Sequence, residues 1–182
     1  MVDYPKYIEY QKEKTTNHEK RKRWLGEEWK PKVMWFKGLF EKYDFLKNCQ
    51  SALCVAARTG QEVKALQDMG ITATGIDIVP CEPLVKEGDM HDIPYPDNSF
   101  DFVFSNSYDH ALYPEKMASE MERVAKKYIT LHLAVDSPTD KYTVTRIKKS
   151  QEAIKHFKKS KVIKDKSMIK KHGLNWEVCF QL

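Results

Sequence analysis

The sequence predicts an α/β fold, a doubly wound and mostly parallel sheet. Short apolar runs at residues 52–56, 72–77 and 100–105 alternate with helical patterns, the arrangement of βαβ units with right-handed crossovers. Glycine or acidic residues follow several of these runs, where strands of such a sheet end. We expect one domain over residues 31–182, preceded by a basic arm or surface helix at residues 1–30.

The first half of the chain supplies two predicted helices and three strands. Apolar and aromatic residues recur at helical spacing over residues 31–46, which indicates an amphipathic helix packed on the core rather than a ligand-binding stripe. Residues 52–56 are continuously apolar, as in a strand buried on both faces. Residues 62–69 read as a helix ended by Gly70. Residues 72–77 and 84–88 are the second strand and a weaker third strand.

The second half of the sequence predicts two strands with a helix between them, a basic helical region and a C-terminal pair of antiparallel strands. Residues 100–105 and 128–135 are apolar strands, with a helix between them at residues 114–125. The region after Lys141 has a basic, helical pattern. Residues 161–168 and 174–182 are strand-like and separated by a turn at Gly173, so we expect an antiparallel pair at one sheet edge.

Composition favours a cytoplasmic protein. No apolar run approaches the length of a membrane span, and the N-terminus lacks the layout of a signal peptide. The four cysteines show no C-x-x-C spacing, which predicts neither a zinc site nor a disulfide framework, so no metal is expected.

Charge is distributed unevenly along the chain. The net charge is +4 over residues 1–50, −8 over residues 51–140 and +9 over residues 141–182. This asymmetry is consistent with two surfaces that meet different partners, RNA or another acidic partner among them. It is equally consistent with lysine-rich elements that only solvate the surface.

Candidate ligand-binding residues lie where the predicted strands end. Ligands of open α/β sheets bind at the carboxyl ends of the strands. The turn at residues 56–60 has small residues and precedes a helix N-terminus, although a single glycine makes it a weak signal. Asp77 ends the second strand, 17 positions after Gly60, where a carboxylate can accept hydrogen bonds from both ribose hydroxyls. The alternative is that Asp77 only caps a turn.

The third strand ends with a second acidic position. Asp89 can accept a hydrogen bond from an exocyclic amine while the backbone N–H of Met90 donates to a ring nitrogen, a pattern that reads adenine. Alternatively, Asp89 and Asp92 are ordinary loop acids.

Taken together, these segments resemble the class I S-adenosylmethionine-dependent methyltransferases. The similarity covers residues 53–133 and is strongest in the small-molecule-type branch, whose third and fourth strands read G-D-x-x-x-L-P-F-x-D-x-S-F-D; residues 88–101 here read G-D-M-H-D-I-P-Y-P-D-N-S-F-D. The resemblance implies a Rossmann-like, seven-stranded sheet with an antiparallel last strand, and S-adenosyl-L-methionine as cofactor with S-adenosyl-L-homocysteine as product. It implies that the methionine moiety lies on the loop, the ribose on Asp77, the adenine on Ile78, and that Asp89 and Met90 read the adenine edge. Ser105 and Asn106 would lie beside the sulfonium; the loop residues are Val55, Ala56, Ala57, Arg58, Thr59 and Gly60.

The chain departs from the family pattern at several positions. Cys54 replaces the acidic residue usual near the end of the first strand, and Ala56 and Arg58 replace two customary glycines. The loop is the A-R-T-G-Q-E-V variant, in which Arg58 either pairs with the cofactor carboxylate or blocks the site. The Pro-Gly-Gly turn before the fifth strand is absent.

The acceptor is not legible from the sequence, although a general base can be suggested. Asp109 and His110 follow the fourth strand, and histidine titrates near neutral pH; alternatively, His110 caps a helix or packs against Tyr113. His91 and His132 are weaker candidates. Four aromatic residues could form a wall for a planar small-molecule acceptor: Trp24, Trp29, Trp35 and Tyr108.

The leading hypothesis is therefore a methyltransferase acting on a small molecule. The alternative is a non-catalytic methyltransferase-like module that binds the cofactor together with a partner or nucleic acid through its basic flanks. An NAD-dependent enzyme is disfavoured because the first strand lacks the G-x-G-x-x-G spacing.

Overall fold

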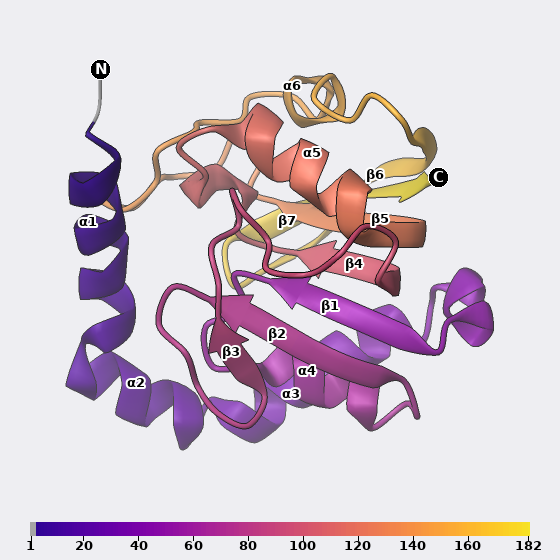
Figure 1. Cartoon of the computed structure of the whole chain (residues 1–182). Helices are drawn as coiled ribbons and strands as arrows, with labels where there is room; N and C mark the ends of the chain where they lie inside the picture. The colour runs from indigo at the N-terminus through magenta and orange to yellow at the C-terminus, as the bar shows by residue number, and fades with distance from the viewer. Residues whose placement is uncertain (1–2) are drawn as a thin grey trace. The chain divides into compact units, whose positions relative to one another are not determined.

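The computed structural model describes residues 3–182, which form two compact units divided between Asp89 and Met90. The first unit begins with three helices, α1 (Tyr4–Thr16), α2 (His18–Leu25) and α3 (Trp29–Phe40), followed by the short 3-10 helix η1 (Asp44–Asn48). It continues with β1 (Ser51–Val55), α4 (Gln61–Gln67), β2 (Thr72–Asp77) and β3 (Val85–Glu87). Figure 1 shows these elements in sequence colours.

Parallel pairing organises the strands of the first unit. Ser51 of β1 lies opposite Thr72 of β2, and Gly75 of β2 lies opposite Val85 of β3. Residues 52–55 of β1 are at most 1% exposed, which explains their unbroken apolar character. Helix α4 packs on β1 and β2, and α3 packs on α4.

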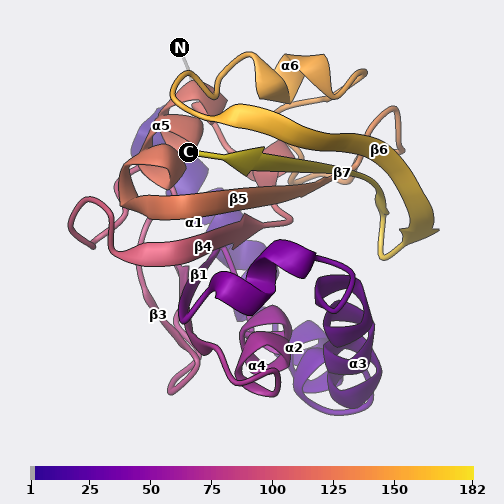
Figure 2. The ribbon, with the colours of Figure 1, turned by 90° about the vertical axis from the view of Figure 1, so that its right-hand side faces the viewer.

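The second unit is built around four strands. Its elements are β4 (Phe100–Ser105), the 3-10 helix η2 (Tyr108–His110), α5 (Pro114–Val124), β5 (Ala125–Leu133), α6 (Gln151–Ile154), β6 (Lys161–Lys171) and β7 (Leu174–Gln181). Strands β4 and β5 are parallel, whereas β7 runs antiparallel to both β5 and β6. Figure 2 shows β5, β7 and β6 side by side.

The strand order is β3-β2-β1-β4-β5-β7-β6 in a seven-stranded sheet. The last strand of the chain, β7, is the reversed one. This confirms the predicted doubly wound, mostly parallel α/β sheet and the antiparallel C-terminal pair.

Two predicted helices were wrong in extent. The helix expected over residues 31–46 ends at Phe40, and residues 44–48 form η1 instead. Residues 142–160 are largely irregular, with only α6 helical. Its backbone groups bond over long range rather than locally: Val144 and Thr145 N–H both donate to the Asp109 carbonyl at 2.9 Å, and Ile147 is buried.

Residues 4–25 of the expected N-terminal arm form α1 and α2, joined at Asn17, whose side chain accepts a hydrogen bond from the Lys20 backbone N–H. The domain boundary near residue 31 stays a prediction. Within residues 3–182, no helix has both the length and the apolar character that crossing a membrane requires.

Candidate functional site

The loop after β1 has a left-handed backbone at alternate positions. The φ angles are +56° at Ala56, +52° at Arg58 and +87° at Gly60. A non-glycine residue in this region costs about 1–2 kcal/mol. Ala56 and Arg58 stand where the family has glycines, and both keep the positive φ angle that glycine adopts easily.

Two glycines allow this loop to pack closely. A side chain at Gly60 would meet the Leu84 Cβ at 2.9 Å, and one at Gly75 would meet the Ala57 Cβ at 2.8 Å. The Ala57 N–H donates to the Ile76 carbonyl at 2.9 Å. The loop is therefore held directly against β2.

Asp77, at the end of β2, joins the first two loops. Its Oδ2 accepts a hydrogen bond from the Arg58 backbone N–H at 2.9 Å, and its Oδ1 accepts one from the Val79 N–H at 3.0 Å. Burial raises the pKa of Asp77, while these two hydrogen bonds and the charges of Arg58 and Arg21 act in the opposite direction. Because a carboxylate has about four acceptor sites, each oxygen can still accept a ligand hydroxyl.

The Arg58 side chain points to α2. Its guanidinium lies 4.5 Å from the centre of the Trp24 ring, a cation–π contact. Gln61, the first residue of α4, donates to the Trp24 carbonyl at 3.0 Å and accepts from the Thr59 hydroxyl at 2.8 Å. The loop side chains thus fasten α2 to the start of α4.

Asp89 follows β3 and is linked to the end of β2 through its neighbour in the chain. The Gly88 N–H donates to the Asp77 carbonyl at 3.0 Å. The Tyr4 hydroxyl of α1 donates a hydrogen bond to Asp89 Oδ2. The first unit therefore collects residues 55–60, Asp77, Ile78 and Asp89 at the ends of three neighbouring strands.

The remaining predicted cofactor residues belong to the second unit. Ser105 is fully buried at the end of β4, and its hydroxyl accepts from the Ser107 N–H at 3.3 Å. The Ser107 hydroxyl donates to the Asn106 side-chain oxygen at 3.1 Å. The roles of Met90, Ser105 and Asn106 in one site with the first group stay predictions.

Asp109 and His110 lie in η2. His110 Nδ1 is 2.9 Å from the Tyr142 carbonyl oxygen. Because a carbonyl only accepts, the neutral imidazole has its proton on Nδ1, which makes Nε2 its basic nitrogen. Asp109 Oδ2 lies 3.9 Å from this Nε2. His110 is therefore oriented through Nδ1 by the Tyr142 carbonyl, while its Nε2 faces Asp109.

The other two candidate histidines, His91 and His132, are packed in the interior. His91 is 1% exposed, accepts from the Tyr113 N–H at 3.3 Å and has its ring 5.9 Å from that of Tyr113. Burial lowers the pKa of His132 to about 4, so it is neutral at physiological pH. Both are better explained by packing than by proton transfer.

Two of the four aromatic residues predicted to line an acceptor site contact other side chains instead. The Trp24 ring is 5% exposed and faces Arg58, and Tyr108 is 1% exposed with its hydroxyl 2.6 Å from His156 Nδ1. These two side chains serve the packing of their own units rather than a planar acceptor.

Reasoning from the sequence missed Tyr4 as a contact of Asp89. The two residues are 85 positions apart, and no motif surrounds Tyr4. It also missed Lys32 and Glu62, two titratable groups whose charges act on each other. Burial lowers the pKa of Lys32 to about 8 and raises that of Glu62 to about 7; the Q-E-V sequence after Gly60 was the available signal.

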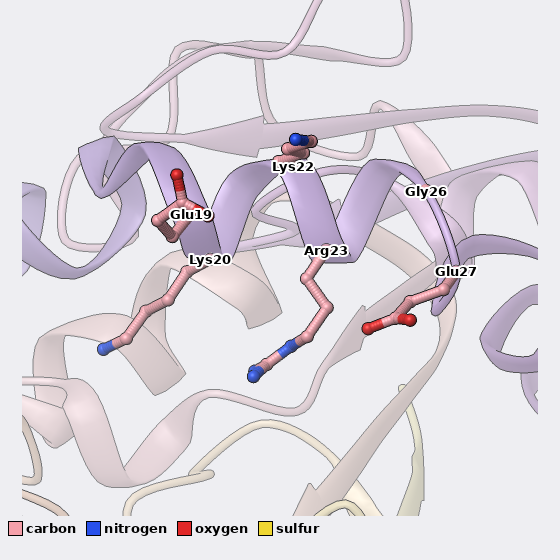
Figure 3. Close-up of a pocket in the computed structure, with 6 residues that line it drawn as sticks. All are labelled: Glu19, Lys20, Lys22, Arg23, Gly26 and Glu27. Atoms are coloured by element: carbon pink, nitrogen blue, oxygen red, sulfur yellow. The ribbon is translucent and has the colours of Figure 1, made fainter.

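The basic cluster of α2 borders a hollow of about 520 Å³. In Figure 3, Lys20 and Arg23 extend to the same side of the helix, and Glu27 turns toward Arg23. Arg23 also pairs with Glu28 at 2.5 Å. The hollow is lined by both signs of charge, from Glu19, Lys20, Lys22, Arg23, Gly26 and Glu27.

Comparison with known proteins identifies a domain within the chain. Residues 53–133 match the family model described as a methyltransferase domain. Comparison with curated protein sequences finds no significant match.

Several solved structures share the fold. The Burkholderia thailandensis 1,6-didemethyltoxoflavin-N1-methyltransferase, solved with 1,6-didemethyltoxoflavin and S-adenosylhomocysteine, has a TM-score of 0.69 at 11% identity, over 100% of this chain and 91% of that one. The PH0226 protein of Pyrococcus horikoshii OT3 has a TM-score of 0.64 at 15% identity, over 92% of each chain. An S-adenosylmethionine-dependent methyltransferase of Archaeoglobus fulgidus has a TM-score of 0.62 at 14% identity, over 82% of this chain and 94% of that one.

At these identities the structural likeness shows the fold, and the family model matches residues 53–133, somewhat less than half of the chain. Residues 53–133 are therefore similar to a methyltransferase domain, and the chain has a fold shared with S-adenosylmethionine-dependent methyltransferases.

Proposed function

We propose that the protein transfers a methyl group from S-adenosylmethionine to a small-molecule acceptor. The observation that supports this most is the left-handed loop after β1 together with the hydrogen bond from its Arg58 N–H to Asp77. This contact holds a loop with a glycine-type backbone beside a strand-end carboxylate, and both belong to the matched methyltransferase domain.

We assign the cofactor to the residues that follow the strand ends. Residues 55–60 would hold the methionine moiety, where a close-packed backbone lets a ligand approach. Asp77 would accept hydrogen bonds from the ribose hydroxyls with its remaining lone pairs, and Ile78 would pack on the adenine. Asp89 and Met90 would read the adenine edge, while Ser105 and Asn106 would line the methyl-donating side. When bound, the cofactor supplies an electrophilic methyl group on a sulfonium.

The protein's own contribution is positioning and proton removal. Alignment of an acceptor atom with the methyl group and exclusion of water are worth several kcal/mol of barrier. His110 would accept the acceptor's proton at Nε2, because its Nδ1–H is directed to Tyr142. Asp109 would stabilise the resulting imidazolium.

A small-molecule acceptor is supported by analogy with the Burkholderia enzyme, whose name gives a small heterocycle as its substrate. The match to a methyltransferase domain supports the enzymatic hypothesis over the non-catalytic one. A role of the basic flanks in binding RNA or another acidic partner, and a cytoplasmic location, stay predictions from the sequence.

The test is formation of S-adenosylhomocysteine by the purified protein. Methyl-labelled cofactor is incubated with a panel of small acceptors that carry N, O or S nucleophiles, and the product is measured by mass spectrometry. We expect acceptor-dependent product that His110→Ala reduces by about 100-fold. Binding of the cofactor without product from any acceptor would contradict methyl transfer and support the non-catalytic module.

A further inference from the structure

Helices α1 and α2 contact each of the loops that follow the first three strands. Trp24 meets Arg58 in the loop after β1, and the Arg21 guanidinium donates to the Pro80 carbonyl after β2 at 3.0 Å. Tyr4 donates to Asp89 after β3. Three side chains from residues 4–24 thus reach three strand ends in succession.

The Tyr4 contact joins two sites that are remote in sequence. The Tyr4 ring lies 5.5 Å from the ring of Tyr7, which is 5% exposed and anchors α1. A hydroxyl that donates to a carboxylate fixes its orientation and favours its ionised form. Asp89 is therefore presented in one orientation before a ligand arrives.

Arg21 acts on the neighbouring carboxylate through its charge. Its positive charge favours the ionised form of Asp77. Residues of α1 and α2 thus act on both Asp89 and Asp77. Neither Tyr4 nor Arg21 belongs to the sequence motifs that resemble the methyltransferases.

We propose that Tyr4 is a positioning residue for adenine recognition, whose hydroxyl holds the Asp89 carboxylate so that it can accept the exocyclic amine. Helices α1 and α2 are then part of the adenosine-binding site rather than an appended arm. This inference rests on the proposed function, since it requires the cofactor to bind at Asp77 and Asp89.

The test is a double-mutant cycle read by isothermal titration with S-adenosylhomocysteine. Tyr4→Phe removes the hydroxyl and keeps the ring. We expect it to weaken binding about 5-fold in the wild-type background, as loss of a typical hydrogen bond implies. In the Asp89→Asn background we expect less than about a 2-fold further effect, because the group that Tyr4 positions is already altered.

Tyr10→Phe is the matched control, since Tyr10 lies on the same helix and is 38% exposed. It should leave binding unchanged in both backgrounds. An equal weakening by Tyr4→Phe in both backgrounds would indicate a structural role only, and tighter binding would mean that Tyr4 competes with the ligand; either result overturns the proposal. Absence of binding by the wild-type protein would instead refute the proposed function.

Discussion

Glu122, a buried carboxylate in the second unit, is held differently from Asp77, a buried carboxylate in the first. In the second unit, Glu122 of α5 is 4% exposed. Its Oε1 accepts hydrogen bonds from the Lys159 N–H, the Ser160 N–H and the Ser160 hydroxyl at 2.9, 2.9 and 2.7 Å, and its Oε2 accepts from the Lys158 N–H at 3.1 Å. In the first unit, Asp77 is 7% exposed and accepts one backbone hydrogen bond at each oxygen.

This difference separates a structural acid from a candidate binding acid. The acceptor sites of Glu122 are used to fix the turn before β6, so little of its capacity is left for a ligand. Asp77 is oriented by the backbone while each oxygen keeps a lone pair for a ribose hydroxyl. Burial of a carboxylate is therefore a weak guide to function, and the identity of its donors is a better one.

The largest effect is expected from Asp77→Asn. An amide cannot accept at both atoms, so the variant loses charge-assisted hydrogen bonds to the ribose and one backbone contact. We expect the affinity for S-adenosylhomocysteine to fall at least about 100-fold by isothermal titration. Asp92→Asn, at an exposed loop acid, should bind normally. If the affinity of Asp77→Asn stayed within about 3-fold of the wild type, Asp77 would not be a binding acid and would not differ from Glu122 in that respect.

Glu122→Gln should act on stability instead. The variant keeps one carbonyl oxygen and places an amide N–H₂ against backbone donors, so we expect the free energy of unfolding to fall by about 2–3 kcal/mol. Chemical denaturation measures this. Glu115→Gln, an exposed change on the same helix, should cost less than about 0.5 kcal/mol.

Ligand affinity should also distinguish Glu122 from Asp77. At a temperature where both proteins are folded, Glu122→Gln should bind S-adenosylhomocysteine within about 2-fold of the wild type. A large loss of affinity without a loss of stability would show that Glu122 takes part in binding and would remove the distinction drawn from its donors.

Glu62 extends the comparison to pH. Burial raises its pKa from 4.5 to about 7, with the charges of Lys32 and Arg58 acting in the opposite direction. Between pH 4.5 and 7 the folded state therefore binds more protons than the unfolded state, so this group's contribution to stability falls as the pH rises. Glu62→Gln lacks this penalty.

We accordingly expect Glu62→Gln to be more stable than the wild type by about 1–2 kcal/mol at pH 7.5, and by little at pH 5. Urea denaturation at a series of pH values measures the difference. The exposed change Glu27→Gln should show no such trend. A stability difference independent of pH would contradict a buried, titrating Glu62.

The smallest effect is expected from Ala56→Gly. Glycine adopts a φ of +56° without steric cost, and this gain exceeds the added entropy of the unfolded chain. We expect an increase of about 0.5–1 kcal/mol in the free energy of unfolding. Ala65→Gly, inside α4, should decrease stability by about 1 kcal/mol or more. A decrease for both would show that Ala56 is not strained.

The sequence predicted the strands that have a continuous apolar pattern and the binding motifs that follow the strand ends. The apolar runs located β2 and β4 at the bounds that the structure has. Residues 88–101 were the specific part of a series of segments that together resembled the methyltransferases. The sequence did not predict the irregular region after Lys141, because Val144 and Thr145 bond to Asp109, more than 30 residues away. The contact of Tyr4 with Asp89 escaped prediction for the same reason, since a tertiary hydrogen bond leaves no periodic signal in the chain.

The central claim, that the strand-end acids of the first unit bind S-adenosylmethionine, is tested most directly by titrating the cofactor into the wild-type protein. We predict saturable heat with a stoichiometry of one and a rise in melting temperature that grows with cofactor concentration. The absence of both heat and a shift in melting temperature at millimolar cofactor would contradict the account.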